Sequence, residues 1–437
     1  MLKIISASDP RALGRLLAVD PADDAALAKR VAAIVADVRR GGDRALVAYA
    51  RRFDKLPASG PAGAVEIPRA EIEAGARQVS RPVGAAIRRA ARVIGRIART
   101  QVPKGSRSAA WPGVVIEQRV TPLARVGCYV PGGRYPLPSS LLMTAIPARV
   151  AGVGEVIACC PRPEPAVLAA ALEAGVSRLY RIGGAHAVAA MAYGTASVPR
   201  VDKIVGPGNA WVAAAKALVA RDCGIDFFAG PSEIVIVADG GRADWIAADL
   251  VAQAEHDPDA RAVLITSSKR LANAVRSAAI AQAAGNPTAQ ASLAKRGGII
   301  VTRSVAQSVE LATAMAPEHL VVDTAAIAAR IPTAGATFVG PWSAQAAGDY
   351  ATGSNHVLPT SGAARFRGGL SAADFVRVSS VQTLSQAGLR RLAPTAIALA
   401  DAEGLTAHAA SIRIRVAKDA GVGPGPGSGG RRRGPRR

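Results

Sequence analysis

The sequence predicts an α/β fold with two similar units in tandem, each built on a parallel sheet, and with helical segments at both ends of the chain. From residue 113 onward, short runs of Val, Ile and Cys alternate with Ala-rich segments of helical spacing. Such alternation is typical of parallel sheets covered by helices. The rhythm stops near residue 230 and then resumes, which indicates a second unit. At 437 residues the chain is also longer than one ordinary domain.

The first 110 residues show helical spacing and no clear strand. Apolar residues recur at helical intervals, and Gly41-Gly42 ends the first helix. The expected helices cover residues 22–40, 43–54, 69–79 and 83–99. The last of these helices carries a stripe of arginines, namely Arg88, Arg89, Arg92, Arg96 and Arg99. We interpret this stripe as a solvated face.

The first α/β unit is expected from residue 114 to about residue 220. Its predicted strands are residues 114–116, 125–130, 156–160, 178–182 and 203–205, with helices at 166–174, 185–193 and 210–220. Glycine-bearing turns follow three of these strands, at residues 131–133, 183–184 and 206–209. A turn between a strand and a helix exposes backbone N–H groups, and the helix dipole favours an anion there. The GxGxxG fingerprint is absent, so ordinary turn chemistry remains the alternative.

The second α/β unit begins with the strand within residues 230–239, which is followed by a helix from Arg242 to His256. Further strands are expected at residues 262–266, 298–302 and 337–339. Gln253 and His256 lie three residues apart and therefore share one face at the end of the helix. An amide oxygen beside an imidazole can form half of a metal site, whereas the alternative is a helix end capped by polar residues. After residue 359 the rhythm is lost, and helices are expected at 384–402 and 405–416.

Composition limits the class of protein. The net charge is +22, but only 4% of the residues are aromatic and no nucleic-acid motif is present. A basic surface that attracts an anionic small molecule is therefore favoured over a nucleic-acid interface. The chain has no apolar run of 18 residues and no signal-peptide pattern. Its four cysteines lack metal or disulfide spacing, so we expect small core residues and a cytoplasmic protein.

The histidines are informative about a functional site, because the chain has only five and most of them share a similar setting. Four lie in the C-terminal half, each near an acid or an amide: His256, His319, His356 and His408. Their settings favour a metal site or an acid–base site over ordinary polar residues. Imidazole and carboxylate ligands suit Zn²⁺, and HExxH is absent.

Seven blocks together resemble the histidinol dehydrogenase family. They are GCYVPGG (127–133), VDKIVGPGN (201–209), AGPSE (229–233), QAEH (253–256), APEHL (316–320), GDYATGSNHVLPT (348–360) and EGLTAH (403–408). The resemblance covers residues 20 to 417 and implies two tandem, incomplete Rossmann-like domains with parallel sheets. It implies a cytoplasmic enzyme of histidine biosynthesis that contains zinc. Such an enzyme oxidises L-histidinol through L-histidinaldehyde to L-histidine and reduces two NAD⁺.

The resemblance also implies domain boundaries. Residues 21–128 and 236–370 would form the first α/β domain, with N-terminal helices and the metal and catalytic residues, and 129–235 would form the second, which faces NAD. Residues 1–20 would be an N-terminal segment and 419–437 a disordered basic tail. The helical segment 371–418 would be exchanged between the two subunits of a homodimer with shared active sites.

By its motifs, the resemblance assigns roles to individual residues. Gln253, His256, Asp349 and His408 would bind zinc. Glu318 and His319 would be the catalytic acid–base pair. Ser232, His356 and Glu403 would contact the substrate, together with His319 and the four zinc ligands. Tyr129, His186 and Asn209 would contact NAD. Glu403 and His408 would reach the active site of the partner subunit.

His186 departs from the family pattern because the family usually has Gln at this position, which affects the expected contact with NAD. Two alternatives to histidinol oxidation also stay open. One is a related zinc- and NAD-dependent dehydrogenase of another small alcohol, such as a sulfonated propanediol. The other is a non-catalytic binder of anions or nucleic acid, suggested by the charge, although the intact Glu318-His319 pair argues against it.

Overall fold

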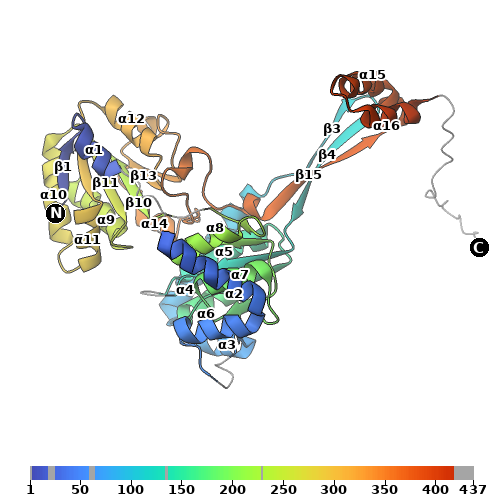
Figure 1. The fold of residues 1–437 in the computed structure, drawn as a ribbon. Coiled ribbons are helices and arrows are strands. Elements are labelled where there is room, and N and C mark those ends of the chain that lie inside the picture. Colours follow the sequence, from blue (N-terminus) through green and yellow to red (C-terminus); the bar gives the residue numbers. More distant parts are fainter. Residues whose placement is uncertain (1, 18–24, 59–63, 133–135, 228–229, 418–437) are drawn as a thin grey trace, which may run out of the picture. The chain divides into compact units, whose positions relative to one another are not determined.

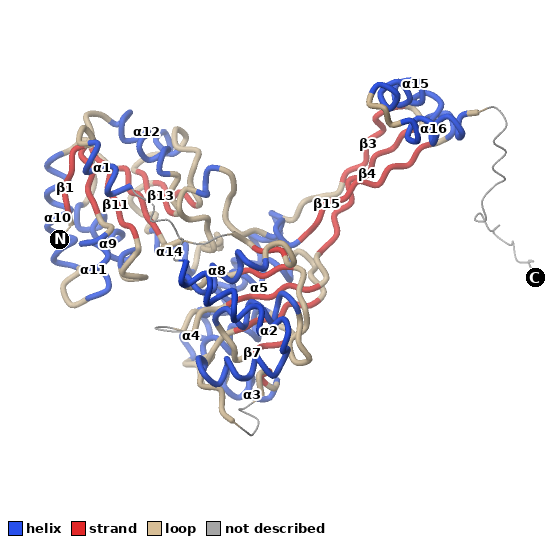
Figure 2. The backbone as a smooth tube through the Cα atoms, viewed as in Figure 1, coloured by secondary structure: helices blue, strands red, loops and turns tan. Residues whose placement is uncertain are grey.

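The computed structural model describes residues 2–17, 25–58, 64–132, 136–227 and 230–417 (Figure 1). The chain divides into two compact units, of which the first contains residues 1–102 and 122–377 and the second contains residues 103–121 and 378–437. Figure 2 shows the strands of three sheets, two in the first unit and one in the second. The expected α/β class with two parallel sheets is confirmed. The expected tail, residues 419–437, lies outside the described residues.

The C-terminal half of the first unit is built on a six-stranded sheet in which the strand pairings of the described residues are all parallel. In spatial order its strands are β1 (Lys3–Ser6), β12 (Gly298–Val301), β11 (Arg261–Thr266), β10 (Glu233–Val237), β13 (His319–Val322) and β14 (Ala336–Val339). Its helices are α1 (Pro10–Leu17), α9 (Ala243–Ala254), α10 (Lys269–Gln282), α11 (Pro287–Lys295), α12 (Val305–Met315), α13 (Ala325–Ala328) and α14 (Gln345–Tyr350). Apolar side chains of α9, α10 and α11 cover one face of the sheet, and those of α12 and α13 cover the other. Burial on both faces explains the nearly continuous Ile and Val runs of these strands.

The second six-stranded sheet is also mostly parallel, with only the short edge strand β2 (Glu66–Ile67) running antiparallel. After β2, its spatial order is β7 (Arg178–Tyr180), β6 (Glu155–Cys159), β5 (Arg125–Tyr129), β8 (Lys203–Val205) and β9 (Gly224–Ile225). The connecting helices are α5 (Pro138–Val150), α6 (Pro165–Ala174), α7 (Gly184–Tyr193) and α8 (Ala210–Val219). Because the chain builds outward from β5 in one direction and then returns to β8, the strand order reverses between β5 and β8. In open α/β sheets, ligands bind at such a point, beyond the carboxyl ends of the strands.

The N-terminal helices pack on this second sheet. They are α2 (Ala25–Tyr49), which is kinked at Gly42, the π-helical turn η1 (Ala50–Asp54), α3 (Arg69–Ala76) and α4 (Arg81–Gln101). Helix α2 contacts α7 and α8, whereas α4 contacts α5 and α6 and α3 contacts α6. The family resemblance groups residues 21–128 with 236–370, and in this structure the N-terminal helices contact the helices of the second sheet. The apolar faces of these helices are buried in the two cores that flank the second sheet.

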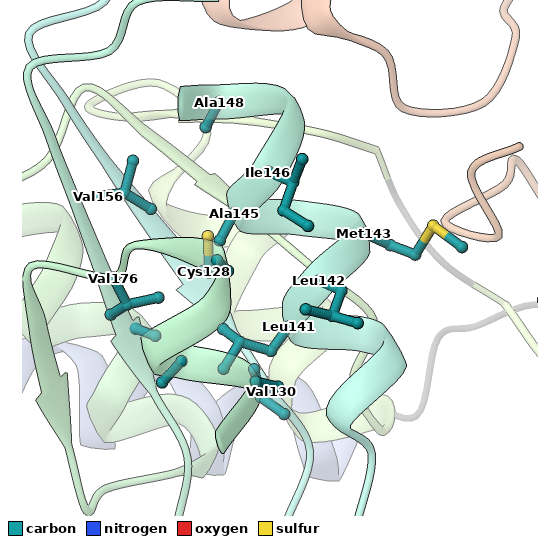
Figure 3. Close-up of a cluster of buried hydrophobic side chains, with 14 of the residues drawn as sticks. Cys128, Val130, Leu141, Leu142, Met143, Ala145, Ile146, Ala148, Val156 and Val176 are labelled. Atoms are coloured by element: carbon teal, nitrogen blue, oxygen red, sulfur yellow. The ribbon is translucent and has the colours of Figure 1, made fainter. Parts of the chain in front are cut away.

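The cores of the second sheet follow the alternation of its strands. Cys128 lies in the cluster under α4, α5 and α6, and its neighbour Tyr129 lies in the cluster under α2, α7 and α8. Figure 3 shows part of the first cluster, where side chains of α5 lie beside Cys128 and Val130. All four cysteines are buried and free, as the sequence predicted. Among the described residues, every helix is too short or too polar to cross a membrane.

The second unit is a small sheet followed by a pair of helices. Its strand order is β15 (Val376–Leu384), β4 (Val114–Pro122) and β3 (Ser106–Trp111), and β3 pairs antiparallel with β4. Helices α15 (Gln386–Ala402) and α16 (Thr406–Val416) contact each other. The sequence predicted these two helices but not β3 or β15, so the C-terminal segment is not only helical. Its large apolar side chains are exposed at Leu399, Leu405 and Ile414.

Candidate active site

The Glu318-His319 pair lies where strand β13 begins, beside strand β10. The backbone of Glu233 holds both side chains: its N–H donates to Glu318 Oε2 (2.8 Å), and its carbonyl lies 3.1 Å from His319 Nδ1. A carbonyl oxygen can only accept a hydrogen bond, so Nδ1 carries the ring proton in the neutral histidine. His319 Nε2 therefore presents its lone pair. That atom is buried and has no hydrogen-bond partner among the described residues.

Burial sets the protonation of this pair. It lowers the pKa of His319 to about 4, so the imidazole is neutral at neutral pH and able to accept a proton. Burial also raises the pKa of Glu318 well above its usual range, which makes its carboxylate a stronger base. A neutral imidazole beside a carboxyl group of raised pKa is suited to proton transfer.

The topology brings the end of helix α9 to the same edge of the sheet. Helix α9 follows β10 and runs back toward the amino end of that strand. Its last turn, with Gln253, therefore lies near the start of the neighbouring parallel strand β13. The side chain of Gln253 is 1% exposed, and neither amide atom has a hydrogen-bond partner in the described part of the chain. Such orphaned polar atoms are costly unless a ligand satisfies them. His256 follows and is exposed, yet its charged form would lower the pKa values of both His319 and His356, so it lies close to them.

Helix α14 supplies the carboxylate of the site. Asp349 Oδ1 lies 3.9 Å from His319 Nε2, and Asp349 Oδ2 accepts from the Gln345 amide (3.0 Å). The backbone carbonyl of Asp349 lies 2.9 Å from Nδ1 of His356, which orients that second imidazole. Helices α14 and α9 contact each other. The structure thus brings five side chains together at the amino ends of β10 and β13: Gln253, His256, His319, Asp349 and His356.

These residues fit a zinc ion in part. No group of three or more His, Cys, Asp or Glu side chains that could hold a metal occurs among the described residues of this single chain. Gln253, His256 and Asp349 instead offer an orphaned amide, one imidazole and one carboxylate, which are donors that zinc accepts. The remaining predicted residues, Glu403 and His408, belong to the second unit and are exposed there.

Two loops support the amino end of β10. Gly230 N–H donates to Thr360 Oγ1 (2.6 Å), and Ser361 N–H donates to a carboxylate oxygen of Glu233 (3.0 Å). Ser232 lies between these contacts and is half-buried, and its side chain favours the charged form of Glu318 and so lowers its pKa. Glu233 is also paired with Arg261 at 3.6 Å. Glu233 was part of the AGPSE motif without a predicted role, although it directly precedes the buried Ile/Val run of β10.

The predicted nucleotide residues lie at the carboxyl edge of the second sheet. Tyr129, at the end of β5, is buried, and its hydroxyl accepts from Gly184 N–H (3.0 Å). Asn209 is exposed and caps α8 by accepting from the N–H groups of Trp211 (3.1 Å) and Val212 (3.3 Å). These two residues flank the point where the strand order reverses. Their contact with NAD stays a prediction.

His186 has a different setting. Its ring is 2% exposed, Nε2 lies 2.7 Å from Asp54 Oδ2, and the rings of Tyr49 and Phe53 lie 6.0 and 6.2 Å away. The same Asp54 oxygen accepts from Gly183 N–H at 2.9 Å. The ring is therefore engaged within the protein, where it pairs with the Asp54 carboxylate that holds the Gly183 turn. The predicted contact of His186 with NAD remains untested.

A neutral buried base beside donors that zinc accepts, in an α/β chain whose second sheet reverses its strand order, points to the class of metal- and nucleotide-dependent dehydrogenases. Comparison with known proteins narrows this class. The family model described as histidinol dehydrogenase matches residues 19–416. The histidinol dehydrogenase of Geobacter sulfurreducens is 46% identical over 394 residues, which is 88% of this chain and 92% of that protein. That of Gluconobacter oxydans is 47% identical over 415 residues, or 92% and 96%.

A solved structure agrees with the sequence comparisons. The crystal structure of histidinol dehydrogenase from Elizabethkingia anophelis superposes with a TM-score of 0.88 and 31% identity, and covers 95% of this chain and 98% of that one. The chain belongs to the histidinol dehydrogenase family. Proteins of this family are NAD-dependent oxidoreductases of histidine biosynthesis that convert histidinol to histidine and use zinc. The predicted family, enzyme class and cofactors are thereby confirmed.

Proposed function

We propose that this chain oxidises L-histidinol through L-histidinaldehyde to L-histidine at a single site, with His319 as the base. The observation that carries the proposal is the state of His319, whose Nδ1–H is held by the Glu233 carbonyl while Nε2 is buried without a partner among the described residues. An imidazole fixed in this tautomer needs no reorganisation before it accepts a proton. The overall reaction consumes histidinol, two NAD⁺ and one water, and yields histidine, two NADH and three protons.

Zinc and NAD supply chemistry that side chains lack: when bound, zinc acts as a Lewis acid that orients the substrate, and NAD accepts the hydride. Gln253, His256 and Asp349 would hold the zinc, with His408 of the partner subunit as the fourth ligand. Ser232 and His356 would contact the substrate, together with Glu403 of the partner subunit. Asp349 would be held in place for this task by Gln345, which donates to its second oxygen.

In the first oxidation, His319 Nε2 removes the hydroxyl proton of histidinol as a hydride leaves the alcohol carbon. Bound NAD would accept the C–H electron pair, and the oxygen's electron pair forms the carbonyl of the aldehyde. The Glu233 carbonyl stabilises the imidazolium that forms, because it still accepts from Nδ1–H.

In the second oxidation, water adds to the aldehyde carbon, and Glu318 removes the proton of that water. The hydrated aldehyde again carries a hydroxyl group and a hydrogen on one carbon. His319, once it has released the proton from the first oxidation to solvent, repeats its role as a second hydride leaves, which produces the carboxylate. The raised pKa of Glu318 supports its assignment as the stronger base for the water.

A homodimer with shared active sites is part of the proposal. The second unit exposes Leu399 (59%) and Ile414 (69%), and exposed side chains of this size mark a surface that meets a partner. Glu403 and His408 lie on the same helix pair as these side chains. We also place the enzyme in the cytoplasm, because its four thiols are free and suit a reducing compartment.

Tyr129, Asn209 and, less directly, His186 would form the NAD side of the site. Support comes from the position of Tyr129 and Asn209 at the reversal of strand order in the second sheet. The decisive experiment follows NADH formed per L-histidinol consumed in the presence of zinc. Two NADH per substrate would support the double oxidation, and one would show that the aldehyde escapes and that the role of Glu318 is wrong. No reaction, together with activity on a sulfonated diol, would identify the other dehydrogenase.

A further inference from the structure

A buried ion pair lies next to the turn that follows strand β8, and the mechanism above does not use it. Lys216 of helix α8 and Asp226, just after β9, form the pair, and their side chains are 3% and 1% exposed. Removing two charges from water is costly, and their mutual attraction seldom gives net stability over an apolar pair. Stability alone therefore does not account for this pair, so its effect on neighbouring groups matters.

Both members of the pair hold the same residue, Gly206. Lys216 Nζ donates to the Gly206 carbonyl (3.0 Å), and Gly206 N–H donates to Asp226 Oδ2 (2.7 Å). The other oxygen of Asp226 accepts from Lys216 and from the N–H of Phe227. Both polar backbone groups of Gly206 are thus fixed by charged, buried partners, and hydrogen bonds to charged groups are the stronger kind.

Gly206 needs this support because its conformation is unusual. Its φ is +118°, and a Cβ at this position would lie 2.1 Å from the carbonyl oxygen of Tyr129. Only glycine adopts this backbone so close to another strand. The contact places the turn of residues 206–209 against the end of β5, where the strand order reverses.

The turn held in this way offers open donors. In the part of the chain that the structure describes, the N–H groups of Gly208, Asn209 and Ala210 have no hydrogen-bond partner. The neighbouring turn differs, because Gly183 N–H donates to Asp54 and Gly184 N–H donates to Tyr129. The turn at residues 206–209 therefore has free N–H groups just before helix α8, and such groups can bind an anionic ligand.

A second layer holds Asp226 from outside. The Arg367 guanidinium donates to the Asp226 carbonyl and lies 4.8 Å from the centre of the Phe227 ring. Arg367 also lies 3.5 Å from Asp374, whose backbone carbonyl accepts from Lys203 Nζ at 2.7 Å. Hydrogen bonds therefore hold Asp226 at its carboxylate and at its backbone carbonyl. Because Asp226 is held in place, its bond to Gly206 N–H also holds Gly206 in place.

We propose that Lys216 and Asp226 are positioning residues for the dinucleotide: they fix the turn of residues 206–209 without touching the ligand. This inference rests on the proposed NAD site at Tyr129 and Asn209. The double variant K216M/D226N tests it, because it removes both charges together and leaves no unpaired buried charge. The amide introduced in place of Asp226 can still accept from Gly206 N–H, whereas the thioether introduced in place of Lys216 cannot donate to the Gly206 carbonyl.

We expect the KM for NAD to rise about tenfold or more, which corresponds to the loss of one well-placed hydrogen bond. The KM for histidinol, the zinc content and kcat at saturating NAD should stay within about threefold, since those depend on the other sheet. A merely structural role would lower the melting temperature and the yield of active enzyme without a selective change in KM. The matched control is E66Q/R178M, which removes an ion pair at the opposite edge of the same sheet and should leave both KM values unchanged.

N209D tests the NAD site itself, because aspartate caps α8 equally well but adds a negative charge beside the dinucleotide phosphates. If N209D raises the KM for NAD and K216M/D226N does not, the positioning role is overturned and the site stands. If neither variant changes that KM, NAD binds elsewhere and both proposals are wrong. Should K216M/D226N fail to fold, D226N alone keeps the side-chain shape. It should then raise the KM for NAD by a smaller factor, and an unchanged value would overturn the inference.

Discussion

Replacing His319 with Asn removes the proposed base and leaves its surroundings in place. The Asn amide can donate to the Glu233 carbonyl as Nδ1 of the histidine does, so the Glu233 backbone can still hold Glu318. What is lost is Nε2, the one buried atom of this residue with a free lone pair among the described residues. The substitution therefore separates proton removal from the structure of the site.

The expected loss follows from the role of Nε2. General base catalysis contributes about 10²- to 10⁴-fold to a rate, or about 3–5 kcal/mol of the barrier. The smaller side chain leaves space at a residue that is 4% exposed, and this costs about 1–3 kcal/mol of folding stability, which a domain of ordinary stability tolerates. We expect kcat for NADH formation from histidinol to fall at least 100-fold while bound zinc stays unchanged.

Initial rates with histidinol, metal analysis and thermal unfolding of the same preparation measure these three quantities. The wild-type enzyme serves as the reference for zinc content and melting temperature. Activity within threefold of the wild type, in a folded and zinc-loaded H319N enzyme, would remove His319 from the mechanism. Loss of zinc together with activity would instead show that His319 belongs to the metal site.

Three further changes test other parts of the structure. Stripping the metal with a chelator should abolish activity and added zinc should restore it, whereas normal turnover by metal-free protein would refute the ligand assignment. Gly206→Ala should lower the free energy of unfolding by about 2 kcal/mol or more in a urea titration, because the new Cβ would meet the Tyr129 carbonyl; a protein of unchanged stability would contradict this. His186→Ala should cost about 2–4 kcal/mol in the same assay, because Asp54 loses its partner and a cavity opens beside Tyr49 and Phe53; an unaffected midpoint would show that the pair is not structural.

Strands and helices with a clear local pattern of apolar residues could be predicted from the sequence. The Ile and Val runs of β10 and β11 and the helical spacing of α9 were sufficient to place those elements. Strand β1 escaped prediction because its four residues have no distinctive period and pair with β12, almost 300 residues later in the chain. The apolar faces of α2 and α4 showed that these helices pack on something, but not on which sheet. Such long-range choices depend on the whole fold.

The candidate site divides in the same way. Histidines are rare in this chain, and four of the five lie near an acid or an amide. His319 and Gln253-His256 could therefore be recognised from residue type and spacing. The Lys216–Asp226 pair could not, because two oppositely charged residues ten positions apart give no signal until the chain is folded. The motif of His186 predicted a contact with NAD, whereas its contact with Asp54, 132 residues away in sequence, is apparent only in the structure.

The two large sheets share one strand order, since β10 to β14 are arranged as β5 to β9 are. Despite the shared order, the predicted functional residues lie at opposite ends of the strands in the two sheets, at the amino ends in the first and the carboxyl ends in the second. In the first sheet the proposed reacting groups lie at the amino ends of β10 and β13. The carboxyl end of β10 is about 13 Å or more away at the usual rise per residue. The glycines at 240 and 241 occupy that opposite edge, and a Cβ at either would meet no atom within 4 Å. This turn is therefore the natural place to insert an affinity tag or a fluorescent label, at the end of the strands that the chemistry does not use.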